Sequence, residues 1–143
     1  FLQRSLRNLM AFDWKKPTVQ MLGRWQPWHE GHQELFKRIH AITGQVAIMI
    51  RTVPSDEEAN ARVPGQDDNP FEMNQVSARL STELAKDGFT SGVDYVIIFV
   101  PNIVDISYGR GVGYTFTEHD LGKAIHDISA TKIRAKMRKE GLL

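Results

Sequence analysis

The chain has 143 residues, a length that suits a single domain with a substantial buried core. Hydrophobic residues make up 41% of the sequence and no apolar run approaches the length of a membrane span, so we expect a cytoplasmic protein that does not bind membranes. The formal net charge of +1 gives no reason to expect a nucleic-acid partner, and the absence of cysteine excludes disulfides and thiolate catalysis.

Residues 1–16 stand apart from the pattern of strands and helices that follows. Apolar residues at positions 1, 2, 6, 9 and 10 could form one face of a short helix, with Arg4 and Arg7 opposite. We expect this extension to pack on the domain or to join two copies of the chain, which would make the protein a homo-oligomer. Residues 17–143 then form the main domain.

Strands and helices alternate from residue 18 onward. Apolar runs predict strands over 18–22, 46–50 and 95–100. Helical spacing predicts a helix through the amphipathic run 34–39, a second helix over 71–86 and a third from about 129–131 onward. Gly44 and Gly88 are expected to end the first two helices. Residues 52–70 are poor in apolar side chains and rich in turn formers, which indicates a mobile loop. Residues 114–117 are interpreted as one more short strand.

This alternation indicates the α/β class, with a Rossmann-like open parallel sheet, right-handed crossovers and helices on both faces. Ligands of such sheets bind beyond the carboxyl ends of the strands. The turn after the first strand, Arg51 after the second and residues 102–110 after the third all fall at that edge. We therefore expect the functional site there.

The turn between the first strand and the first helix carries the strongest chemical signal, Gly23-Arg24-Trp25-Gln26-Pro27-Trp28-His29-Glu30-Gly31-His32. It places two histidines at a helix N-terminus, where free N–H groups and the helix dipole favour an anion. Gly31 lacks a side chain and would let a nucleotide lie against the backbone. Imidazoles in this position can donate hydrogen bonds to phosphate oxygens and stabilise charge that develops during phosphoryl transfer.

Other interpretations of these glycines and histidines are weaker. The zincin signature needs histidines four apart on a helix, these are three apart, and no cysteine can complete a zinc set, so we expect no protein-bound metal. A capping turn with incidental histidines is the other alternative. Residues 109–113 fail the spacing of a dinucleotide-binding loop and Gly122-Lys123 lacks the rest of a Walker A loop, so kinase chemistry is disfavoured.

Two segments resemble the signature motifs of the nucleotidylyltransferase superfamily. The turn resembles G-R-F-x-P-x-H-x-G-H, and Ile128-Ser129-Ala130-Thr131-Lys132-Ile133-Arg134 resembles I-S-x-T-x-I-R. The resemblance spans roughly residues 19–137, and its motifs are most similar to those of the archaeal-type nicotinamide mononucleotide adenylyltransferases. It implies the nucleotidylyltransferase (HUP-type) fold and the transfer of a nucleoside monophosphate, AMP by preference, from a triphosphate to a small phosphorylated acceptor, with release of pyrophosphate.

The resemblance also implies roles for individual residues. The side chains that contact the triphosphate and stabilise the transition state would be His29, His32, Thr131 and Arg134. The positions that surround the nucleotide would be Gly23, Arg24, Gln26, Gly31, Ile128 and Ser129. The residues that face the acceptor would be Trp28, Arg51, Asn102, Tyr108 and Arg110. Mg²⁺ would bridge the triphosphate and be held mainly by phosphate oxygens and water.

The middle of the chain departs from the archaeal-type enzymes and leaves the acceptor open. Residues 108–114 stand where those enzymes carry a glycine-asparagine loop, and the arginine that they place soon after Asn-Pro-Phe is out of register, with Val76 and Arg79 nearby. Cytidylyltransferases usually carry an arginine just before the second motif, and its absence here favours ATP over CTP. The alternatives are a cytidylyltransferase and a catalytically silent nucleotide-binding domain; a class I aminoacyl-tRNA synthetase fragment is disfavoured by the small size.

Overall fold

Three apolar runs with alternating burial pair into an open parallel sheet. The strands are β1 (Val19–Gly23), β2 (Val46–Arg51) and β3 (Tyr95–Val100), in the order β1-β2-β3. The structure is a computed structural model that describes residues 11–54, 66–111, 113–126 and 128–143. Along β2, Val46, Ile48 and Ile50 are fully buried while the residues between them are partly exposed, which identifies the face turned to the core. The predicted α/β class and all three predicted strands are confirmed.

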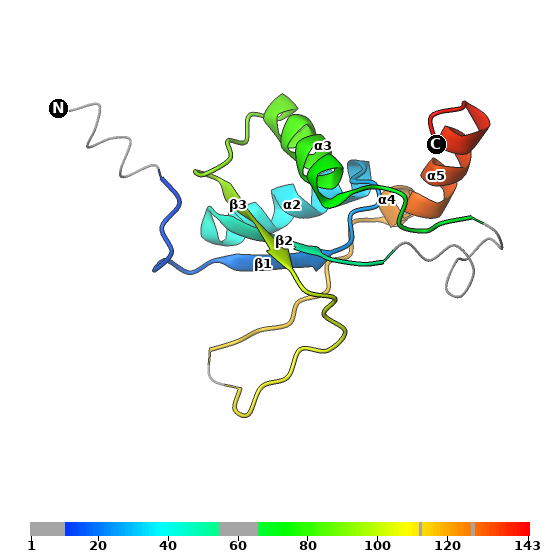
Figure 1. Cartoon of the computed structure of the whole chain (residues 1–143). Helices are drawn as coiled ribbons and strands as arrows, with labels where there is room; N and C mark the ends of the chain where they lie inside the picture. Colours follow the sequence, from blue (N-terminus) through cyan, green and yellow to red (C-terminus); the bar gives the residue numbers. More distant parts are fainter. Residues whose placement is uncertain (1–10, 55–65, 112, 127) are drawn as a thin grey trace.

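Two amphipathic helices make the crossovers between the strands. Helix α2 (Glu30–Thr43) buries Phe36 and Ile39, and α3 (Met73–Lys86) buries Val76, Leu80 and Leu84. Gly44 ends α2 in the left-handed conformation with φ of 77°, as expected for a C-terminal cap. Both helices lie on the same side of the sheet (Figure 1).

The expectation of helices on both faces is therefore not met in the described part of the chain. The strand order advances in one direction, and two successive right-handed crossovers then bring both helices to one face. Helices α4 (Lys123–His126) and α5 (Ala130–Lys139) follow and lie beyond the carboxyl ends of β1 and β2 (Figure 1). The N-termini of α2 and α5 thus point to the same edge of the sheet.

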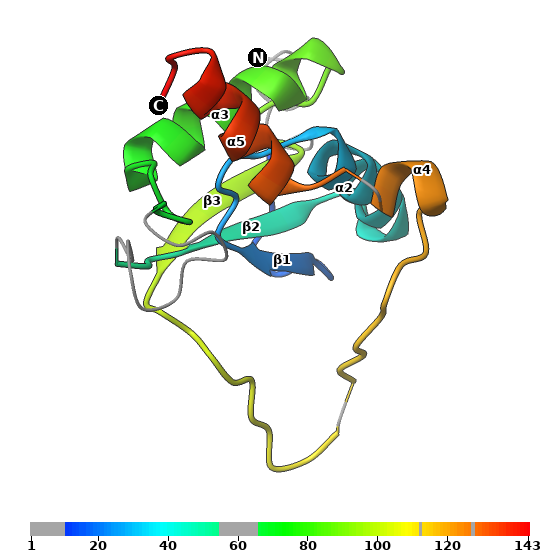
Figure 2. The same ribbon diagram turned by 90° about the vertical axis from the view of Figure 1, so that its right-hand side faces the viewer.

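A long segment leaves the carboxyl end of β3, and its described residues, 101–111 and 113–122, have no regular structure. We call these residues the strap. Figure 2 shows it running away from the sheet and returning to α4. The strand predicted for 114–117 is wrong: these residues have no regular structure, Tyr114 and Phe116 are 69% and 64% exposed, and no strand in the described part of the chain pairs with them. Tyr108 stacks on Phe116 at a ring-centroid distance of 5.6 Å, and Arg38 Nη1 donates to the carbonyl of Asp120 at 2.6 Å.

Two further predictions, the N-terminal helix and the mobile loop, fall partly outside the described residues. Of the predicted N-terminal helix, residues 1–10 lie outside the described residues, and 11–16 form a turn whose Phe12 N–H donates to the carbonyl of Gly92. Of the predicted mobile loop, 55–65 lie outside the described residues, while Asp68 and Asn69 are buried. Among the described helices, none is long and apolar enough to cross a membrane.

Candidate functional site

The two histidines of the first motif form a reciprocal cap at the start of α2. His29 is the N-cap residue; its Nδ1 accepts a hydrogen bond from the Gly31 N–H at 3.0 Å. His32, in the first turn, accepts from the His29 N–H through its own Nδ1 at 3.2 Å. The two imidazole rings stack with a centroid distance of 3.7 Å and an interplanar angle of 19°. The cap therefore fixes both rings in one orientation.

This hydrogen bonding determines the protonation of the rings. A ring nitrogen that accepts from a backbone N–H carries no proton, so each neutral imidazole has its proton on Nε2. Burial and, to a smaller extent, the adjacent His29 lower the pKa of His32 to about 3. Burial and the positive charge of Arg79 also lower the pKa of His29. At neutral pH the pair thus offers two uncharged N–H donors.

The free backbone N–H groups expected at the start of α2 are partly used by the cap itself. The Gly31 N–H points to the ring of His29, so an anion at this helix end would meet Nε2–H groups in addition to main-chain amides. A Cβ on Gly31 would lie 2.8 Å from Cε1 of His29 and 3.6 Å from the carbonyl oxygen of Ile125. Glycine at this position leaves room both for the ring and for the approach of α4.

The rest of the turn is built into the protein interior. Trp25 adopts a positive φ of 55° and lays its ring against Gly23, where a Cβ would come within 2.7 Å of it. Its indole N–H donates to the carbonyl of Met49 at 3.1 Å. Trp28 is 1% exposed, and its indole N–H donates to Gln33 at 2.8 Å. Trp28, expected to face the acceptor, is thus a core residue whose ring is covered.

Gln26 and Arg24, expected around the nucleotide, both bond to the segment before α3. The Gln26 amide donates to the carbonyl of Phe71 at 3.0 Å and accepts from the Phe71 N–H at 2.9 Å. Arg24 Nη1 donates to the side-chain oxygen of Asn69 at 3.0 Å. Residues 66–71 are therefore fastened to the turn by three hydrogen bonds, which explains why they are ordered against it.

The second motif begins α5 where the sequence predicts it. Ser129 is the N-cap residue, and its hydroxyl accepts from the Lys132 N–H at 3.4 Å. Arg134 is 1% exposed; it donates to the carbonyl of Gln26 at 2.7 Å, to Asp68 at 3.1 Å and to the Thr131 hydroxyl at 3.3 Å. These Arg134 donors have partners within the protein. The predicted contact of Arg134 with phosphate stays a prediction.

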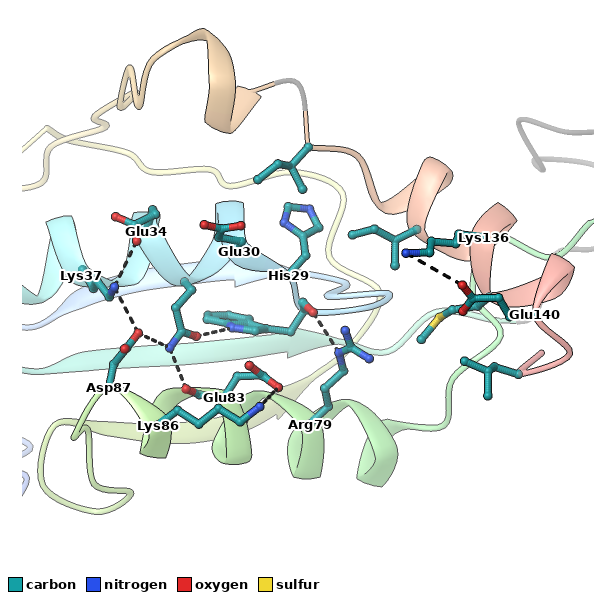
Figure 3. Close-up of a pocket in the computed structure, with 16 residues that line it drawn as sticks. His29, Glu30, Glu34, Lys37, Arg79, Glu83, Lys86, Asp87, Lys136 and Glu140 are labelled. Atoms are coloured by element: carbon teal, nitrogen blue, oxygen red, sulfur yellow. Dashed lines mark hydrogen bonds and ion pairs between the residues drawn. The ribbon is translucent and has the colours of Figure 1, made fainter.

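An open groove with a volume of about 750 Å³ runs between α2, α3 and α5 and reaches His29 and Ile128. Figure 3 shows His29, Arg79 and Lys136 around one end of it. Arg79 Nε donates to the carbonyl of Trp28 at 2.9 Å, and within the described residues its Nη atoms make no hydrogen bond or ion pair. The other end carries ion pairs, such as that of Lys37 with Asp87 at 3.1 Å.

Arg79 is a functional candidate that the motifs alone do not select. Arg79 is the arginine among the described residues that line the groove, and Figure 3 shows it on α3 below the ring of His29. Its positive charge acts on that ring, since it lowers the pKa of His29. A departure from the expected register after Asn-Pro-Phe was the only signal in the sequence, and it left Val76 and Arg79 equally open. The structure separates them, because Val76 is buried in the core at 2% exposure.

The residues expected to face the acceptor do not all come together. Arg51 ends β2 at the carboxyl edge, and its Nε is buried without a hydrogen-bond partner in the described part of the chain. Asn102, Tyr108 and Arg110 are exposed on the strap, which Figures 1 and 2 show extending away from the turn that carries the histidines.

Comparison of the chain with protein-family models, with curated proteins and with solved structures finds no match. The functional assignment therefore rests on the two motifs and on the geometry around them.

Proposed function

We propose that this protein is a nucleotidyltransferase with the Rossmann-like fold of the nucleotidylyltransferase superfamily. It transfers a nucleoside monophosphate, AMP by preference, from a nucleoside triphosphate to the phosphate of a small acceptor. The observation that carries the proposal is the pair of neutral imidazoles at the start of α2, whose Nδ1 atoms accept backbone amides and whose Nε2–H groups remain as donors. The resemblance of both motifs to those of that superfamily supports the same reaction.

In the proposed reaction an oxygen of the acceptor phosphate attacks the α-phosphorus of the triphosphate. A new P–O bond forms while the bond to pyrophosphate breaks, and pyrophosphate leaves with the electron pair. No protein nucleophile is required, so catalysis depends on alignment and on donors directed at the developing charge. Because burial keeps the pKa of His32 near 3, its Nε2–H donates in the neutral state at physiological pH.

The groove provides further positive groups for the triphosphate. Arg79 is held by its Nε at the carbonyl of Trp28, which leaves the two Nη atoms to contact phosphate oxygens next to His29. Ser129 and Thr131, at the start of α5, would hold the terminal phosphates with hydroxyl and backbone N–H groups, as the resemblance implies. The helix dipole of α5 favours the same negative charge.

The acceptor is proposed to lie at the carboxyl edge of β1 and β2. Arg51 ends β2 there, and its buried Nε would gain a hydrogen-bond partner from a phosphate oxygen. Asn102, Tyr108 and Arg110 would also contact the acceptor, which requires the strap to approach this edge.

Mg²⁺ would enter as part of the magnesium–triphosphate substrate. Phosphate oxygens and water are the ligands that Mg²⁺ commonly keeps in such complexes.

The decisive experiment follows pyrophosphate release from ATP or CTP with a panel of small phosphorylated acceptors. The matched variant is His32→Asn. Its side-chain oxygen can still accept the His29 N–H, but the Nε2–H donor is lost. We expect release by the wild-type chain with at least one acceptor and a reduction of roughly a hundredfold in the variant. Binding of nucleotide without turnover on any acceptor would instead identify the silent nucleotide-binding domain.

The choice of base is tested by thermal unfolding with Mg²⁺ and equal concentrations of ATP or CTP. A ligand that binds only the native state raises the melting temperature, and at equal concentration the tighter ligand raises it more. We expect the larger shift with ATP, and a larger shift with CTP would replace adenylyl by cytidylyl transfer while keeping the mechanism.

A further inference from the structure

The interior of the molecule contains an ion pair that the motifs do not explain. Arg134 and Asp68 are separated by 66 positions in the sequence, and their side chains are 1% and 7% exposed. The distance between Arg134 Nη2 and Asp68 Oδ1 is 3.1 Å. Burying two charges costs solvation energy that their attraction offsets only when the surrounding hydrogen bonds are satisfied. The buried pair therefore constrains the two segments that carry Arg134 and Asp68.

The Arg134 guanidinium joins three separate segments. It extends from α5, donates through Nη1 to the carbonyl of Gln26 in the first motif, and binds Asp68 in the segment before α3 through Nη2. Gln26 in turn bonds both main-chain groups of Phe71, in that same segment. The start of α5, the turn before α2 and residues 66–71 thus form one closed set of contacts.

The closed set lies between the two helix N-termini that the proposed function uses. We propose that Asp68 is a positioning residue: it orients Arg134 so that the Gln26 carbonyl is held, and this sets the spacing between the His29–His32 cap and the N-terminus of α5. Arg134 acts in this arrangement as the tie between the two motifs, through donors that have partners within the protein. This inference rests on the proposed function for its catalytic consequence, but the spacing itself is independent of it.

The physical consequence is a loss of alignment when the pair is removed. Misplacement of reacting groups by about 1 Å can reduce a rate by roughly a hundredfold. Contacts that hold the triphosphate through His29 and Arg79 would persist, because those side chains have their own backbone anchors. We therefore expect kcat to fall by roughly tenfold to a hundredfold while the Kd for ATP changes by less than about threefold.

Three variants test the inference. Asp68→Asn keeps an oxygen that can accept from Arg134 but removes the charge. Asp68→Leu combined with Arg134→Met replaces the pair by apolar groups, a change that preserves folding where a single deletion leaves an unpaired buried charge. Arg138→Gln is the control: Arg138 also bonds residues 66–67, through Gln66 and the carbonyl of Asp67, but it makes no bond to Gln26.

Each variant is measured for the urea midpoint of unfolding, kcat, the Kd for ATP, and hydrogen exchange of the Phe71 amide. In the folded double variant we expect the selective fall in kcat and exchange at Phe71 faster by about tenfold or more, with the Asp68→Asn variant intermediate and the control unchanged. An unchanged kcat and unchanged exchange in the folded double variant would overturn the inference. So would equal losses in kcat and ATP affinity, which indicate direct phosphate contact by Arg134. If the wild-type chain transfers no nucleotide, the proposed function fails, and the exchange of Phe71 still decides whether Asp68 holds the turn.

Discussion

Acidification should destabilise this protein through His32. The folded-state pKa of His32 is about 3, well below the value of about 6.5 for a histidine in an unfolded chain. Between these values the unfolded state binds the proton and the folded state does not, so the free energy of unfolding falls as the pH decreases. At pH 8 both states are neutral, and at pH 5 only the unfolded state is charged. The expected loss between pH 8 and pH 5 is about 2 kcal/mol from this one group.

Urea denaturation of the wild type and of His32→Asn at both pH values measures this loss. The variant lacks the titrating group but keeps an oxygen to accept the His29 N–H, so its stability should depend on pH less steeply by about 2 kcal/mol over the same interval. The lowered pKa of His29 contributes with the same sign in both proteins. Equal losses in the two proteins, or titration of the His32 ring near pH 6.5 by NMR in the folded state, would refute the assignment of a neutral buried imidazole.

Three further predictions concern the same cap. His32→Gln, whose amide nitrogen can reach the position of Nε2, should retain more turnover than His32→Asn, and steady-state kinetics of both variants would show the opposite order if the cap alone mattered. Gly31→Ala should lower the free energy of unfolding by about 1 kcal/mol, because the added Cβ displaces the His29 ring from its cap; a variant as stable as the wild type would contradict the contact. Arg79→Gln should weaken ATP binding by roughly tenfold and raise the pKa of His29, since the positive charge of Arg79 lowers it. Calorimetry measures ATP binding and NMR titration measures the pKa of His29. Lys86→Gln on the same helix is the control. Equal effects in both variants would argue against a specific role of Arg79.

The sheet and its helices were predictable because their signals are local. Alternating apolar residues in β2 and helical spacing in α3 report burial of one face directly, and Gly44 marks a helix end by its conformational freedom. The position of Ser129 as the N-cap residue of α5 follows from the same kind of local rule. The prediction of a short strand at 114–117 was wrong because apolar alternation indicates a possible strand but does not show whether a neighbouring strand can pair with it.

The site was predictable only in part, because its geometry depends on contacts between distant positions. The histidines and Arg51 fall where a strand-turn-helix pattern puts them. In contrast, the burial of Arg134 depends on Asp68, which no motif includes, and the role of Gln26 depends on the main chain of Phe71. Motif resemblance points to candidate residues without distinguishing a side chain that contacts a ligand from one that holds the turn in place.

The hydrogen bonds between Gln26 and residue 71 restrict the amino-acid types at the two positions to different degrees. The amide of Gln26 replaces a peptide group here, donating to one main-chain carbonyl and accepting one main-chain N–H, as a neighbouring strand residue would. Any residue with a backbone N–H can fill that role at position 71, and proline alone cannot. Position 26 has no such freedom, because the partner atoms belong to its side chain and must reach the full length of glutamine. Random mutagenesis should therefore recover many residue types at 71, limited only by packing, and almost none at 26.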